Sequence, residues 1–350
     1  MFTKTLYGIG FAALLFVLVG LFLPREVHVE RQVAIERPAI TVFTLLNGYR
    51  SFLAWSPWAG RDPDAVYELS GPATGVGARL SWEGDPRLVG SGWQEITEVQ
   101  PNEWVRSKLN FDLQSAADTW FRIDETAGGA LVTWGFDSDL VSGQGFVGGL
   151  LARYFGLFFD RWIGTDYERG LVKLKTYAES LPAADFSDLE VELLHAEPLD
   201  ILYVSSDNSA NPGDVAESLA AAYREITTFM LDNELEIRAQ PMAITRAWDE
   251  KGYRFDAAVP VVMRDVPLTG RIRFGKSPSG PALRAIHRGP YETMTPTYEK
   301  IDAFMAAHGL EEGRVSWEHY VVNPGATPPE DWVTHIYFLL SNASSGVPEP

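Results

Sequence analysis

A glutamate lies among aromatic residues near the end of the chain, in the stretch VSWEHYVVNP (315–324). The stretch has the composition of a β-strand and is closed by an Asn-Pro turn signal. Alternate side chains of a strand share a face, so Glu318 and Tyr320 point to one side and Trp317 to the other. A carboxylate walled by aromatic rings loses hydration, and a cation that also stacks on the rings would be a favourable partner. The alternative is that Glu318 faces water from an exposed sheet face.

Three further aromatic residues are candidates for the same site. Tyr291 follows the turn Gly289-Pro290, which can aim its ring. Its hydroxyl could orient a ligand or stabilise developing negative charge, and a packed core tyrosine is the alternative. Tyr203 and Trp248 lie earlier in the same region and are candidate walls, although a core role would suit each of them equally well.

The composition argues against several kinds of chemistry. The chain of 350 residues has no cysteine, which rules out disulfides, cysteine-based zinc sites and cysteine nucleophiles. Its six histidines are scattered without an HExxH motif, so no metal site is expected. It contains neither a P-loop nor a nucleophile elbow, and no cofactor is expected. A formal net charge of −18 argues against nucleic acid as a partner.

The N-terminus carries an uncharged apolar run from Thr5 to Pro24, TLYGIGFAALLFVLVGLFLP. A run of this length can cross a hydrocarbon core of roughly 30 Å. We therefore expect residues 1–25 to be a transmembrane anchor that meets the membrane through residues 5–24. A cleaved signal peptide is the alternative, but the run is long for one and ends without a small-residue cleavage site. The anchor predicts a single-pass membrane protein whose soluble domains lie outside the cytoplasm.

Residues 26–180 have the pattern of a first domain of strands and helices. VHVERQVAIER (27–37) alternates apolar and polar residues, as a half-buried strand does. Further strand candidates follow between turns, and a long helix is expected from about Phe146 to Glu179. Most tryptophans of this region are expected in the core, and some could line a cavity for an apolar ligand. They are Trp55, Trp58, Trp82, Trp93, Trp104, Trp120 and Trp134.

The last part of the chain contains an internal repeat. Phe229-Met230 and Phe304-Met305 lie 75 residues apart, each near the end of a helix-like stretch. Each helix follows a strand and precedes two strands, so each half reads strand–helix–strand–strand. Two such halves can form a pseudo-twofold sheet with both helices on one face. The other face, or the seam between the halves, would be a natural place for a concave site.

The second region resembles the GyrI-like small-molecule-binding domain over residues 187–343. The resemblance lies in HRGPYETM, the helix after it, the Trp-Glu-x-Tyr strand and the Asn-Pro turn. It implies that Glu318 sits in an aromatic pocket that meets cationic or electrophilic ligands, with Tyr291 in the pocket and Trp332 as a further wall. The candidate ligand-binding residues are Glu318, Tyr291, Trp317, Trp332, Tyr203 and Trp248.

The first region resembles the START-like family, also called SRPBCC or polyketide-cyclase-like, over residues 26–180. The motifs are the opening strand, the WSPW stretch (55–58) and the closing DRWIGTDYERGLVKLK (160–175). The resemblance implies a helix-grip, in which a curved antiparallel sheet surrounds a long C-terminal helix. The whole chain is therefore expected to be α+β. A transmembrane helix would precede a helix-grip domain, and a linker at 181–189 would lead into a pseudo-twofold (βαββ)2 domain.

Three functions remain open at this point. The leading expectation is a membrane-anchored small-molecule-binding protein whose second domain takes an amphipathic or cationic ligand against Glu318. Its first domain would hold a second, apolar ligand or serve as a scaffold. The alternative is a hydrolase of small reactive electrophiles, in which Glu318 activates water and Tyr291 assists the developing anion. The third is a structural or partner-binding module, which predicts no room beside the carboxylate.

Overall fold

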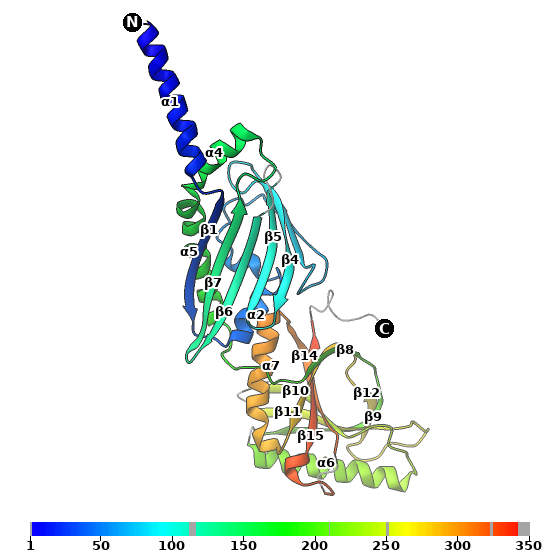
Figure 1. The fold of residues 1–350 in the computed structure, drawn as a ribbon. Helices are drawn as coiled ribbons and strands as arrows, with labels where there is room; N and C mark the ends of the chain where they lie inside the picture. The colour runs from blue at the N-terminus through cyan, green and yellow to red at the C-terminus, as the bar shows by residue number, and fades with distance from the viewer. Residues whose placement is uncertain (1, 112–116, 210, 250–251, 323–324, 342–350) are drawn as a thin grey trace. The chain divides into compact units, whose positions relative to one another are not determined.

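The chain divides into two compact units, Met1–Asp185 and Phe186–Pro350. Each unit has an antiparallel sheet of its own (Figure 1). Each also has its own hydrophobic core. The computed structural model describes residues 2–111, 117–209, 211–249, 252–322 and 325–341.

The N-terminal helix α1 runs from Phe2 to Phe22. The expectation of a transmembrane anchor at residues 5–24 is wrong, because no helix of the described chain is long and apolar enough to cross a membrane. The placement of the soluble domains outside the cytoplasm stays a prediction.

A seven-stranded antiparallel sheet, in the order β1-β7-β6-β5-β4-β3-β2, forms the framework of the first unit (Figure 1). In β4 the buried residues are Gly92, Gln94 and Ile96, and their neighbours are more exposed. This alternation is typical of a strand with one face on a core. The strands are β1 (Glu26–Ile35), β2 (Val66–Ser70), β3 (Arg79–Glu83), β4 (Ser91–Gln100), β5 (Trp104–Phe111), β6 (Ala117–Thr126) and β7 (Gly129–Asp139).

Four helices that follow α1 in the first unit share one core with the sheet. The longest, α5, buries Tyr167, Leu171 and Leu174 in that core. The single helix expected from Phe146 to Glu179 is interrupted at 157–158, just after Gly156, a residue of low helix propensity. The helices are α2 (Ala39–Leu46), α3 (Phe52–Trp55), α4 (Phe146–Gly156) and α5 (Phe159–Ser180).

The second unit has an eight-stranded sheet in the order β12-β9-β11-β10-β14-β15-β13-β8. Its strands are β8 (Val191–Ala196), β9 (Asp200–Asn208), β10 (Met242–Asp249), β11 (Gly252–Pro260), β12 (Arg273–Lys276), β13 (Gly280–Arg288), β14 (Glu312–Tyr320) and β15 (Val333–Leu340). Its helices are α6 (Pro212–Asp232), α7 (Met294–His308) and the short 3-10 helices η1 (Tyr291–Thr293) and η2 (Pro329–Asp331).

The two halves of this sheet are related by a pseudo-twofold axis. The first half has the order β9-β11-β10 and the second β13-β15-β14, and they join where β10 pairs with β14. At this seam Ala243 lies directly opposite Glu318. The two residues are 75 positions apart, which is also the spacing of the sequence repeat. Glu318 therefore sits beside the axis, where both halves can reach it.

The helices α6 and α7 pack on the sheet in corresponding ways. Phe229 and Met230 of α6 are buried in one cluster, and Met305 of α7 is buried in another. The helix α7 ends at Gly309, whose φ of 61° is left-handed and suits glycine after a helix. A further cluster, which includes Trp317, covers the opposite face of the sheet. The face with Glu318 is thus the one toward α6 and α7.

Candidate functional site

The carboxylate of Glu318 accepts hydrogen bonds from two tyrosines. The Tyr298 hydroxyl donates to Oε1 at 2.6 Å, and the Tyr320 hydroxyl donates to Oε2 at 2.8 Å. Tyr320 lies two residues from Glu318 on β14, so both share a face, and Tyr298 comes from α7. Hydrogen bonds to an ionised acceptor are short and strong. They hold the partly buried carboxylate in one orientation.

Further aromatic rings surround this group. The Tyr320 ring meets Tyr291 at 5.4 Å and Tyr223 at 6.4 Å between centroids. Tyr291 lies 4.7 Å from the Trp332 ring. Tyr223 belongs to α6 in the first half, whereas Tyr291 and Trp332 belong to the second. We use the name Glu318 cluster for Glu318, Tyr223, Tyr253, Tyr291, Tyr298, Tyr320 and Trp332.

The tyrosines of the Glu318 cluster remain protonated far above neutral pH. Burial raises the pKa of Tyr223, Tyr298 and Tyr320, and the negative charge of Glu318 raises it further. The pKa of Tyr291 is raised by the same two causes. Burial, with a smaller contribution from Glu318, raises the pKa of Tyr253 to about 12. These phenols are therefore neutral hydrogen-bond donors, and none of them carries a charge that could balance the carboxylate.

Two features of the Glu318 cluster lack a partner within the described chain. Glu318 forms no ion pair with a described Lys, Arg or His, and its hydrogen-bond partners among the described residues are the two phenols. The hydroxyl of Tyr223 is buried and has no hydrogen-bond partner among the described residues. An unpaired buried donor costs about 1–3 kcal/mol. An unbalanced charge and an unpaired hydroxyl in one cluster are features that a ligand could satisfy.

The structure brings two of the expected aromatic residues to Glu318 and separates a third from it. Tyr291 and Trp332 belong to the cluster, linked to Glu318 through Tyr320. Trp317 lies on the opposite face of β14, where it is 3% exposed and stacks on Tyr337 at 4.7 Å. Strand alternation causes this separation, because neighbouring residues of a strand point to opposite faces.

Tyr203 and Trp248 also lie away from the carboxylate. Tyr203 packs against the cluster that contains Trp317, on the opposite face of the sheet. Trp248 is 65% exposed near the end of β10 and meets the Glu318 cluster through the Tyr253 ring, at 4.8 Å. Neither residue therefore forms a wall around Glu318 itself.

Tyr223, Tyr253 and Tyr298 are members of the cluster that the sequence reasoning missed, and Tyr320 was placed on the face of Glu318 without being named a binding residue. A signal for two of them exists, because Tyr223 and Tyr298 are 75 residues apart and so occupy equivalent positions of the repeat. Tyr320 shares a strand face with Glu318, which alternation alone indicates. Tyr253 lies on β11 and interacts electrostatically with Glu318, and no local pattern predicts this interaction between distant segments.

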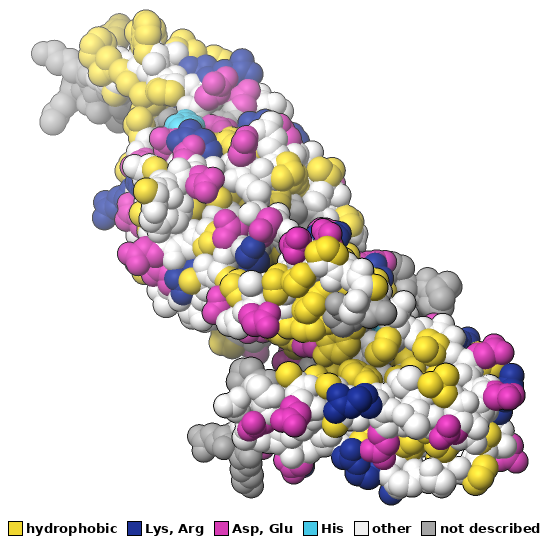
Figure 2. All heavy atoms as spheres, turned by 90° about the horizontal axis from the view of Figure 1, so that it is seen from below, with side chains coloured by type: hydrophobic (Ala, Val, Ile, Leu, Met, Phe, Trp, Pro, Cys, Tyr) yellow, Lys and Arg dark blue, Asp and Glu magenta, His cyan; other side chains and the backbone are white. Residues whose placement is uncertain are grey.

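Two observations on the described residues concern metal ligands and surface charge. No group of three or more described His, Asp or Glu side chains could hold a metal ion. On the face shown in Figure 2, the described acidic and basic side chains are interspersed. A nucleic-acid-binding face instead gathers basic side chains into a patch or stripe.

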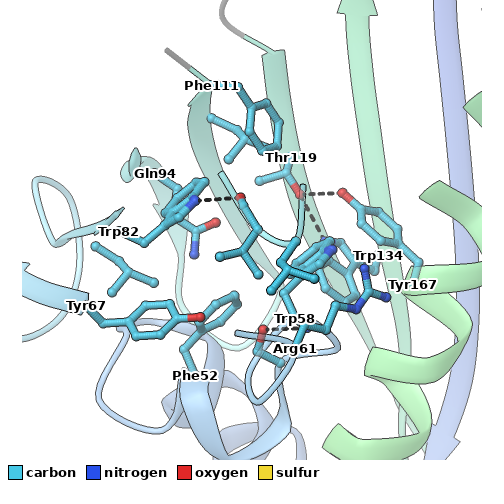
Figure 3. Close-up of a pocket in the computed structure, with 15 residues that line it drawn as sticks. Phe52, Trp58, Arg61, Tyr67, Trp82, Gln94, Phe111, Thr119, Trp134 and Tyr167 are labelled. Atoms are coloured by element: carbon cyan, nitrogen blue, oxygen red, sulfur yellow. Dashed lines mark hydrogen bonds between the residues drawn. The ribbon is translucent and has the colours of Figure 1, made fainter. Parts of the chain in front are cut away.

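The first unit contains a cavity of about 230 Å³ (Figure 3). Strands β2 to β7 and helices α3 and α5 all contribute to its lining. The walls are largely aromatic, which is the usual character of a site for an apolar or ring-bearing molecule. The aromatic residues include Phe52, Trp58, Tyr67, Trp82, Trp134 and Tyr167.

Hydrogen bonds fix several of these walls. The Thr119 hydroxyl accepts a bond from Trp134 Nε1 at 2.9 Å and lies 3.1 Å from the Tyr167 hydroxyl. The rings of Trp134 and Tyr167 stack at 3.9 Å. On another side, Trp58 Nε1 donates to Asp166 at 3.1 Å, and Arg61 forms an ion pair with the same carboxylate. The walls are thus held in place by bonds within the unit.

The two units match two families of known proteins. The first unit has a sheet and helices around a cavity, and the second has a pseudo-twofold sheet that carries an aromatic cluster. Concave sites with apolar and aromatic walls are typical of small-molecule binding. Residues 26–179 match the family described as polyketide cyclase/dehydrase and lipid transport, and residues 189–341 match the GyrI-like small molecule binding domain. The chain therefore carries one domain of each family, in the order that the motifs predict, and this prediction is confirmed.

Comparison with individual proteins shows distant likenesses. No curated protein matches the chain. A hydrolase from Listeria innocua is 15% identical, over 43% of this chain and 92% of that one, with a TM-score of 0.34. EcmrR in a DNA complex is 14% identical, over 55% and 83%, with a TM-score of 0.38. The Aha1 dimer from Colwellia psychrerythraea is 15% identical, over 44% and 96%, with a TM-score of 0.31.

Proposed function

We propose that this chain binds a cationic, amphipathic small molecule at the Glu318 cluster. One observation carries the proposal: the Glu318 carboxylate is partly buried, and its partners in the described chain are two neutral phenols. A charge taken out of water without a counter-charge is costly. A cationic ligand would supply the balancing charge that the described side chains do not.

The rings around Glu318 suit the same kind of ligand. Aromatic faces attract cations electrostatically, and the attraction grows when the site excludes water. The rings of Tyr291 and Trp332, 4.7 Å apart, offer such faces together with apolar area for the body of the ligand. The position equivalent to Glu318 in the other half is Ala243, so the seam carries one carboxylate there and not two. A ligand with one positive charge therefore matches the seam better than a ligand with two.

The alternative that Glu318 activates water for hydrolysis is less well supported. Each carboxylate oxygen already accepts a bond from a phenol. Abstraction of a proton from water would require a further partner on a carboxylate that two phenols already hold.

The change Glu318→Gln keeps the shape of the side chain and removes its charge. We expect it to weaken binding of 10-methylacridinium, a permanent cation, by roughly 1–3 kcal/mol, because a charge-assisted interaction is lost from a partly desolvated site. Neutral 10-methylacridone has the same three-ring framework, and its affinity should change little. Isothermal titration calorimetry of both ligands with both proteins measures the difference.

Glu312→Gln is the matched control, since Glu312 is an exposed glutamate on the same strand. It should leave the affinity for both ligands unchanged. An unchanged acridinium affinity in Glu318→Gln would contradict the proposal, and an equal loss for both ligands would point to a damaged site instead. Turnover of an electrophile by the parent protein, abolished in Glu318→Gln with substrate binding retained, would favour the hydrolase.

A further inference from the structure

Gln94 of β4 places a buried amide in the lining of the cavity of the first unit. Its side chain is 8% exposed, and Figure 3 shows the amide directed into the cavity. The amide has no hydrogen-bond partner within the part of the chain that the structure describes. An amide has two donors and one acceptor, and those of Gln94 face the cavity, where a ligand could pair with them.

The surroundings of Gln94 give no structural reason for an amide. Its neighbours across the strands are Leu80 on β3 and Leu109 on β5, and both of them also line the cavity. A leucine would fit this face and leave no polar group unpaired. An amide kept between two leucines is therefore a candidate recognition group for something that enters the cavity.

Most other polar groups of the lining are already paired. The indole N–H groups of Trp58, Trp82 and Trp134 all donate to protein oxygens. The Tyr167 hydroxyl is hydrogen-bonded to Thr119. Among the buried side chains of the lining that the structure describes, Gln94 is the one whose polar atoms form no hydrogen bond, since those of Ser56, Thr119, Trp134 and Tyr167 each form at least one.

The lining of the cavity has little net charge that could bind a charged ligand. Arg61 is the basic side chain of the lining, and it is paired with Asp166 through two of its nitrogens. An anion would have to compete with Asp166 for this guanidinium, and a cation would meet no free carboxylate in the lining. The electrostatics therefore favour a neutral molecule.

The volume limits the size of that molecule. The cavity measures about 230 Å³. An apolar cavity of about 150 Å³ is known to accept benzene, and sites for drug-sized ligands begin near 300 Å³. A compact molecule of one or two rings matches a volume between these limits, and the aromatic walls provide faces for stacking.

We infer that this cavity binds a compact, neutral molecule of one or two rings whose single carbonyl or hydroxyl group pairs with the Gln94 amide. The inference concerns the first unit and does not depend on the Glu318 cluster. It assigns Gln94 as the residue that selects ligands with a polar group over pure hydrocarbons of the same shape.

The test compares 2-naphthol with naphthalene, two probes that differ by one hydroxyl. The full chain should bind both, and Gln94→Leu should lower the affinity for 2-naphthol by about five- to tenfold, the effect of one net hydrogen bond. The affinity for naphthalene should stay the same or rise. Equilibrium dialysis measures both, and Gln94→Met provides a second variant without an amide if the leucine variant folds poorly.

Gln100→Leu makes the same change at an exposed position of β4 and should alter neither affinity. Glu318→Gln should also leave 2-naphthol binding unchanged, which separates this inference from the proposal for the second unit. Three results would overturn the inference. They are equal 2-naphthol affinity in the parent and both Gln94 variants, no binding of either probe by the parent, and binding of the 2-naphthoate anion as tight as that of 2-naphthol.

Discussion

Tyr223 and Tyr298 occupy equivalent positions in the two halves of the second unit, yet their hydroxyls have different surroundings. The Tyr298 hydroxyl donates to Glu318, whereas the buried Tyr223 hydroxyl lacks a partner in the described chain. The pseudo-symmetry of the fold therefore does not extend to its hydrogen bonds. The cause lies at the seam, where one half supplies Glu318 and the other Ala243.

This asymmetry predicts opposite effects for the same substitution. Tyr298→Phe removes a bond to a charged acceptor and should lower the free energy of unfolding by roughly 1–3 kcal/mol. Tyr223→Phe removes an unpaired hydroxyl and should leave the free energy unchanged or raise it by up to about 1 kcal/mol. Urea denaturation of the two variants checks this. Equal losses in both would show that the hydroxyl of Tyr223 also has a stabilising partner.

The lowered pKa of His319 predicts that the fold loses stability in mild acid. Burial, and then the neighbouring His335, lowers the pKa of His319 to about 4. A histidine with a lowered folded-state pKa stabilises the fold fully above its unfolded pKa of about 6.5, and this contribution is lost as the pH falls toward 4. We expect the free energy of unfolding to fall by roughly 1–3 kcal/mol over that range for this group.

Urea denaturation between pH 7 and pH 4.5 measures the slope, and His319→Gln should reduce it. A slope that is identical in the parent and in His319→Gln would contradict the assignment.

At the scale of single residues, the local sequence pattern predicted part of the Glu318 cluster. Alternation along β14 correctly places Tyr320 with Glu318 and Trp317 away from it. Trp317 was nevertheless a candidate because it adjoins Glu318 in sequence, and the opposite faces of a strand make that adjacency misleading. The hydroxyl bond from Tyr298 depends on how α7 lies over the sheet, which no local pattern predicts.

At the scale of elements, the repeat was the most informative signal. The spacing between Phe229-Met230 and Phe304-Met305 predicted two strand–helix–strand–strand halves, and the sheet order has this arrangement. The same spacing relates Tyr223 to Tyr298 and Ala243 to Glu318. Apolar composition was less reliable, because it predicted one helix where α4 and α5 are separate and a membrane-spanning segment at α1.

Sequence patterns did not predict the volume of the cavity of the first unit or the role of Gln94 in it. Its lining comes from six strands and two helices, so its volume depends on how the whole sheet closes on α5. The sequence reasoning expected that some tryptophans would line a cavity, and Trp58, Trp82 and Trp134 do. Gln94 has no distinguishing motif, because an unpaired amide is recognisable only once its neighbours are known.

At the scale of the whole molecule, the chain carries two candidate ligand sites of different chemical character. The Glu318 cluster combines a carboxylate with aromatic rings, and the cavity of the first unit combines aromatic walls with a single free amide. The first favours a cation and the second a neutral molecule. Each unit has its own core, so each site can be tested within the full chain by substitutions that leave the other unit intact.

The structure of the full chain in complex with 10-methylacridinium tests the central claim most directly. We predict that the charged ring system stacks on Tyr291 or Trp332, within about 6 Å of the ring centroid, with its positive charge toward the Glu318 carboxylate. The bonds from Tyr298 and Tyr320 should remain, because they orient the carboxylate. A ligand seated elsewhere in the second unit, with Glu318 still bound to the two phenols alone, would contradict the account.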